Sequence, residues 1–215
     1  MRERLAKMVW AVPLFFWVAN TSWAVSYSYV FDMSEYEVPL GGTVDVSIYL
    51  EETGGTVFRD SGLIGAGVKV RFDNPPVPSN PAKIVTTADV TNISDFELEW
   101  AKSAEPEAGY ADLLLGTWDY VYGMEVAPDV YRIPLGRFRF SAGTVLGEVT
   151  NIRATDYDPS SGDVVYYDNE LNPVELDVLL NDATATITVT PEPGTLLLLV
   201  IAGLGLLNYA WCRRK

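Results

Sequence analysis

Carboxylates are the main side chains in this sequence that could carry chemistry. The 215 residues include 29 Asp and Glu, no histidine and a single cysteine, Cys212. The lack of histidine and of further cysteines excludes Ser-His-Asp and Cys-His catalysis, zinc sites built from His or Cys, and disulfides within the body of the chain. Any metal would have to be a hard ion held by oxygen atoms, for which calcium is the natural candidate.

One acidic segment, TDYDPSSGDVVYYD, has a pattern that favours calcium. It places Asp156, Asp158 and Ser160 at alternate positions, with Asp163 further along. Alternate oxygen ligands in a tight loop are how proteins wrap this ion, although Tyr167 stands where an EF-hand loop has its glutamate. We therefore predict Asp156, Asp158 and Asp163 as calcium ligands. The alternative is an acidic surface loop between two strands.

A second segment, GTWDYVYGMEV, carries aromatic side chains at alternate positions. On a regular strand Trp118, Tyr120 and Tyr122 share one face, and Asp119 lies on the other. Such a face is a candidate flat platform for stacking sugar rings. The alternative is that the three aromatic residues pack into the core or under a loop.

Paired carboxylates are also the groups that hydrolyse glycosides. Glu97, Glu99, Glu105 and Glu107 lie close together in the sequence, but acidic residues are so abundant here that such pairs carry little weight. The sequence therefore predicts a protein that is not an enzyme. A secreted glycan hydrolase remains an alternative hypothesis.

The charge of the body limits its partners. Between Val25 and Pro193 there are nine basic residues and 28 acidic ones. Such a surface repels nucleic acid phosphates and anionic lipid headgroups and attracts cations. We expect no nucleic-acid partner.

The first 24 residues have the layout of a secretory signal peptide. Basic residues come first, an apolar run extends from Met8 to Ala19, and Ser22-Trp23-Ala24 gives the small-x-small pattern of a cleavage site. The apolar run is too short to span a bilayer of about 30 Å comfortably. We predict cleavage after Ala24, and the alternative is an N-terminal membrane anchor.

The last 25 residues also form a three-part signal. An apolar segment, Leu196–Ala210, is marginally long enough for a transmembrane helix, and the basic residues after it would stay in the cytoplasm. The polar parts of the signal are Pro191, Glu192 and Pro193 before the helix, and Arg213, Arg214 and Lys215 after it.

This end resembles the PEP-CTERM sorting signal of Gram-negative bacteria. The resemblance implies recognition by an exosortase, a membrane transpeptidase-like enzyme, and removal of the tail near the motif. It also implies export through the inner membrane, anchoring by the C-terminal helix, and then a place at the cell surface or in a matrix of the exopolysaccharide and biofilm type. The alternative is a plain C-terminal anchor. A Gram-positive sortase signal does not fit, because no Leu-Pro-x-Thr-Gly precedes the helix.

Residues 25–190 carry short alternating segments separated by turn residues. In TVDVSIYLEE the residues Val46, Ile48 and Leu50 share one face, and YRIPLGRFRFSA alternates phenylalanine with arginine. Outside the two ends, only TTADVTNI and VELDVLL suggest short helices. About eight or nine strands without βαβ alternation predict an all-β fold, an antiparallel β-sandwich or jelly roll.

The order of segments in the body resembles the cohesin-like and carbohydrate-binding-module sandwiches. The resemblance is carried by EVPLGGTVDVSIYLEE, LIGAGVKVRFDNPP, IPLGRFRFSAG and the closing ATATITV. It implies a non-catalytic module that binds a partner protein or polysaccharide. We therefore expect an exported surface or matrix protein with a structural or interaction role. The alternative is a polysaccharide-binding module that uses the aromatic face.

Overall fold

The structure is a computed structural model that describes residues 24–72, 82–192, 194, 198–204 and 206. The predicted signal peptide, apart from Ala24, lies outside the described residues, as do residues 196, 197, 205 and 207–210 of the predicted C-terminal helix and the basic residues after it. Among the described residues, no helix is long and apolar enough to cross a membrane.

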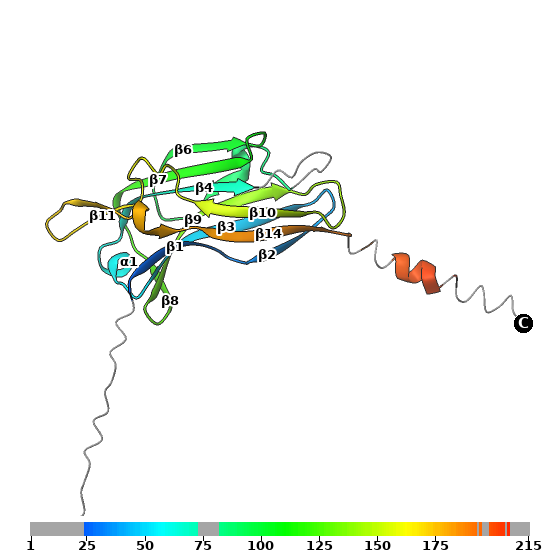
Figure 1. The fold of residues 1–215 in the computed structure, drawn as a ribbon, viewed down its shortest axis with the longest axis horizontal. Helices are drawn as coiled ribbons and strands as arrows, with labels where there is room; N and C mark the ends of the chain where they lie inside the picture. The colour runs from blue at the N-terminus through cyan, green and yellow to red at the C-terminus, as the bar shows by residue number, and fades with distance from the viewer. Residues whose placement is uncertain (1–23, 73–81, 193, 195–197, 205, 207–215) are drawn as a thin grey trace, which may run out of the picture.

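The described strands form two sheets that face each other as a sandwich (Figure 1). The first sheet contains β1 (Ser26–Phe31), β3 (Thr43–Thr53), β5 (Val90–Asn92), β8 (Met124–Ala127), β9 (Val130–Ser141) and β13 (Leu180–Asn181). The second contains β2 (Glu35–Pro39), β4 (Leu63–Phe72), β6 (Leu98–Glu105), β7 (Tyr110–Val121), β10 (Val149–Thr155), β11 (Val165–Tyr167), β12 (Pro173–Glu175) and β14 (Ala183–Thr190). Short helical turns are α1 (Val57–Asp60), η1 (Thr87–Asp89) and η2 (Asp177–Leu179). An all-β body in two sheets agrees with the sequence prediction.

The pairing differs from a purely antiparallel sandwich. β1 pairs in parallel with β13, and β14 pairs in parallel with β2 while its other side is antiparallel to β10. Alternation shows which segments are strands but does not encode which neighbour each strand takes, so the prediction was wrong at these two pairs. The two segments that suggested helices contain one short helical turn each, η1 and η2, and strand residues beside it.

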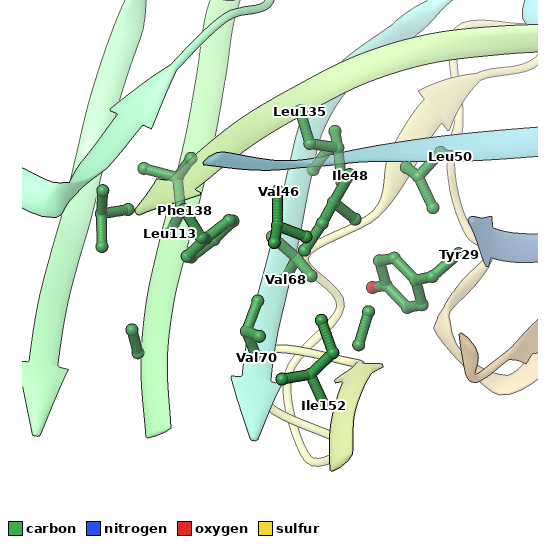
Figure 2. Packing of buried hydrophobic residues seen from close by; sticks show 14 of the residues in the cluster. Tyr29, Val46, Ile48, Leu50, Val68, Val70, Leu113, Leu135, Phe138 and Ile152 are labelled. Atoms are coloured by element: carbon green, nitrogen blue, oxygen red, sulfur yellow. The ribbon is translucent and has the colours of Figure 1, made fainter. Parts of the chain in front are cut away.

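The core lies between the sheets and is built from the alternating faces that the sequence predicts. Val46, Ile48 and Leu50 of β3 are fully buried, as are Val68 and Val70 of β4. Figure 2 shows these side chains together in the core, with the ring of Tyr29 beside them. On β9, Phe138 and Phe140 are buried while Arg137 and Arg139, which alternate with them, are exposed. Burial of these faces is the main term that stabilises the fold.

Ile48 tests this core. It is 0% exposed on β3, which pairs with β1 on one side and β9 on the other. Ile48→Ala should lower the free energy of unfolding by about 2–5 kcal/mol, because it leaves a cavity in a packed interior. Ser47→Ala, one residue away on the opposite face, should change it by less than about 0.5 kcal/mol. Denaturant unfolding measures both, and equal effects would contradict this assignment of faces.

Candidate functional site

The aromatic residues predicted for sugar binding lie on the surface. Trp118 is 87% exposed, Tyr122 is 53% exposed and Tyr120 is half-buried, so none of the three belongs to the core. The register between β4 and β7 shifts near Gly65, and in this part of β7 both Trp118 and Asp119 are exposed. Exposure therefore does not alternate along this part of β7, and the expected opposition of Trp118 and Asp119 stays a prediction.

The three aromatic rings do not make one flat platform. The rings of Tyr120 and Tyr122 are tilted by 44°, with centroids 6.3 Å apart. The structure adds Trp100 of β6, whose indole lies across Gly116 of β7 and is 56% exposed. Any side chain at position 116 would collide with this indole, because a Cβ there would lie 2.1 Å from it. A glycine within a strand often marks a place where another group approaches the backbone closely, but the sequence alone does not show that this group is Trp100.

Three carboxylates from separate segments meet beside β4 in the second sheet. Asp156 directly follows β10, Asp163 lies just before β11, and Asp177 opens η2 after β12. One oxygen of each lies within 4.8 Å of one oxygen of the other two. We call these three residues the carboxylate cluster.

The cluster lies where β4 changes its neighbour. β4 pairs with β10 over residues 69–72 and with β11 at Gly65. Gly67 lies between these two stretches, and the chain from β10 to β11 passes over it. A Cβ at Gly67 would lie 1.9 Å from Asp163 Oδ2 and 2.6 Å from the Cβ of Tyr157. Glycine is therefore required for the Asp163 carboxylate to reach its place.

The members of the cluster differ in their hydrogen bonds. Asp177 Oδ1 accepts the backbone N–H groups of Asp163 at 3.2 Å and of Val164 at 3.1 Å. The side chain of Asp163 is only 6% exposed, and neither of its carboxylate oxygens has a donor among the described residues. The same is true of Asp156 Oδ1 and Asp177 Oδ2.

The surroundings of the cluster disfavour ionisation. Burial, then the neighbouring carboxyls of Asp177 and Asp156, raises the pKa of Asp163 far above its ordinary value. Burial also raises the pKa of Asp156. Tyr29 donates its hydroxyl to the carbonyl oxygen of Gly67 at 2.8 Å, and burial followed by the charges of Asp163 and Asp156 raises its pKa.

The structure brings two of the three predicted calcium ligands together and adds one. Asp158 lies outside the cluster, because its Oδ1 accepts the backbone N–H of Ser160 at 3.0 Å and its hydroxyl at 2.7 Å. These hydrogen bonds lower the pKa of Asp158. Sequence reasoning missed Asp177, which lies 14 residues after Asp163 in a segment that suggested a helix. Only the fold places it beside the acidic loop.

Comparison with known families finds a match for the C-terminal segment of the chain. Residues 189–215 match the family model described as the PEP-CTERM protein-sorting motif. The chain carries a PEP-CTERM protein-sorting motif. The match contains Pro191-Glu192-Pro193 and the final basic residues, the features on which the sequence prediction depended. It describes a sorting motif and not a catalytic domain. No curated protein matches the chain.

Several solved structures are similar to the body. One is the second type II cohesin module of the ScaA scaffoldin of Acetivibrio cellulolyticus, at 12% identity and TM-score 0.39, with 74% of this chain and 95% of that one covered. Another is the type II cohesin A11 of Bacteroides cellulosolvens, at 11% identity and TM-score 0.34, with 78% and 99% covered. A third is the major pilin subunit BcpA of Bacillus cereus, at 7% identity and TM-score 0.34, with 78% and 41% covered.

Gly67→Ala tests the close approach of Asp163 to β4. It should destabilise the protein by about 1–3 kcal/mol, because the added methyl group overlaps the Asp163 carboxylate. In an Asp163→Ala background the same change should cost less, since two of the three atoms nearest to the new Cβ belong to that carboxylate. A double-mutant cycle by denaturant unfolding measures this coupling. Strict additivity would mean that the carboxylate does not lie over Gly67.

Proposed function

We propose that this chain is exported, sorted by an exosortase-type enzyme and displayed at the cell surface or in the extracellular matrix. Its β-sandwich has a non-catalytic structural or interaction role there. The observation that carries the proposal is the PEP-CTERM match at residues 189–215, which begins at the end of β14. Before processing, the segment Leu196–Ala210 anchors the chain in the inner membrane.

The position of the sandwich supports removal of both ends. Its first strand begins at Ser26, two residues after the predicted cleavage at Ala24, and its last strand ends at Thr190, just before Pro191. Thr190 still pairs with Pro39 of β2. Cleavage after Ala24 and near the motif would therefore leave every described strand whole.

A non-catalytic role is supported by the side chains available. The chain lacks histidine, and Glu99, one of the carboxylates considered for glycan hydrolysis, forms an ion pair with Lys102 at 2.8 Å. The partner in this proposal is another surface protein or an extracellular polysaccharide.

Polysaccharide binding is the second candidate function, and the exposure of Trp118 favours it. An indole that is 87% exposed keeps a large apolar surface in water, and sugar rings bury such surfaces by stacking. Tyr122 is exposed a few residues along the chain. Because the rings of Tyr120 and Tyr122 are tilted, Trp118 carries this candidate.

Replacing Pro191, Glu192 and Pro193 together by alanine tests the sorting. In cells with an exosortase-type enzyme, the wild-type chain should lose its C-terminal tail, and the variant should keep residues up to Lys215 and stay in the membrane fraction. Mass spectrometry of C-terminal peptides and cell fractionation measure this. A control with alanine at Pro106 and Pro128, both in turns of the sandwich, should be processed normally. Equal loss of the tail from the motif variant would mean that Pro191, Glu192 and Pro193 do not direct the cleavage, and a wild-type chain that keeps its tail would be a plain anchor.

Trp118→Ala tests polysaccharide binding. Affinity electrophoresis in acidic and neutral polysaccharides should show retardation of the wild type and a several-fold weaker effect for the variant, because the exposed indole is lost. Val178→Ala removes another highly exposed apolar side chain, 90% exposed on η2, and should migrate like the wild type. Identical mobility of all three proteins would remove this candidate function.

A further inference from the structure

The carboxylate cluster buries more negative charge than its surroundings compensate. Six buried side-chain oxygens have no donor among the described residues, and four of them belong to the cluster: Asp156 Oδ1, Asp163 Oδ1 and Oδ2, and Asp177 Oδ2, the other two being those of Glu148. Asp163 is more than nine-tenths buried and points into the cluster. A carboxylate that leaves water without a donor or a positive charge costs several kcal/mol. Something other than these side chains must compensate the charge.

No basic side chain of the described residues is in place to do so. None of their salt bridges includes a member of the cluster. Lys69 lies on β4 close by, but its Nζ is above the rings of Tyr110 and Tyr157, 5.5 Å from each centroid. Among the described residues the charge of the cluster thus has no basic partner, and either protons on the carboxyls or a bound cation must compensate it.

The chemistry of the cluster favours a hard divalent cation, and its spacing is compatible with calcium. All the donors are carboxylate oxygens, which hard divalent cations prefer. Two ligands of one calcium ion, each at 2.3–2.6 Å, lie at most about 5 Å apart, and for magnesium the limit is about 4.2 Å. Mutual separations within 4.8 Å thus fall inside the reach of calcium. Calcium also tolerates the irregular geometry that three separate segments provide.

We propose that Asp156, Asp163 and Asp177 bind one calcium ion beside β4 in the second sheet. Asp177 is already oriented for this, because its Oδ1 is held by two backbone N–H groups while its Oδ2 is buried without a donor among the described residues. The ion ties the end of β10, the start of β11 and the start of η2 together above Gly67. Water and backbone carbonyls complete its coordination. This site does not depend on how the chain is sorted.

Thermal unfolding of the full-length chain in detergent micelles tests the site. Far-UV circular dichroism gives the Tm in EGTA and then at increasing free calcium. With calcium at about ten times Kd, the Tm of the wild type should rise by about 3–6 °C and return on chelation. The same concentrations of magnesium should give a smaller rise. Terbium, a luminescent substitute for calcium, should be sensitised by Tyr29 and Tyr157 and displaced by calcium.

Three variants separate this site from general binding of calcium to an acidic surface. Asp163→Asn and Asp156→Asn should each lose the calcium-dependent rise in Tm. Neither should unfold in EGTA, because each removes one of the mutually repelling charges. Asp158→Asn is the matched control in the same loop and should respond like the wild type, since Asp158 lies outside the cluster.

Two results would overturn the site. If calcium leaves the Tm of the wild type unchanged, the three carboxyls share protons instead of an ion. If calcium raises the Tm of Asp163→Asn and Asp156→Asn as much as that of the wild type, the ion binds elsewhere on the acidic body. Should Asp163→Asn fail to fold, Asp156→Asn and terbium luminescence of the wild type still decide between these outcomes.

Discussion

The second sheet depends on how β4 is paired. One side of β4 is covered by β7, but the other side is shared between β10 and β11, so the ladder is interrupted around Gly67. Backbone groups left open in a buried sheet need other partners. From the core side, Tyr29 donates a hydrogen bond to the Gly67 carbonyl, and from the other side the acidic loop covers the glycine. The acidic loop thus covers the interruption in the pairing of β4 at Gly67.

Two buried acidic residues of this protein, Glu52 and Asp163, differ in whether backbone groups donate hydrogen bonds to their carboxylates. Glu52 is fully buried, and its two oxygens accept the backbone N–H groups of Val57 at 2.9 Å and Phe58 at 2.8 Å. Those groups open α1 and have no partner within the helix, so the carboxylate and the helix satisfy each other. Asp163 is almost as buried but receives no such donor. Burial alone therefore does not distinguish a structural acid from a ligand. The two residues differ in their donors, because both oxygens of Glu52 accept a backbone N–H group and neither oxygen of Asp163 does.

The sequence predicted the elements better than the way they assemble. Alternation located the buried faces of β3, β4 and β9, because a period of two follows directly from the geometry of a strand. It could not predict the parallel partners of β1 and β14, nor the break in alternation at Trp118, since both depend on contacts between distant segments. For the same reason the acidic loop could be suspected from its own residues, while Asp177 could not. The sorting motif was predictable, because its parts are contiguous.

The strand register also relates the candidate sites to the sorting tail. Thr190 ends β14, whose other end, Ala183, pairs with Ala154 just before the carboxylate cluster. Eight residues of strand separate these points by about 23 Å. Trp118 lies near the same end as the cluster, because β7 finishes opposite Leu63 and β11 meets β4 at Gly65. Figure 1 shows β11 and the end of β14 on opposite sides of the sandwich. A chain anchored beyond Thr190 would thus carry both candidate sites at the end of the sandwich away from its attachment, where a partner outside the membrane can reach them.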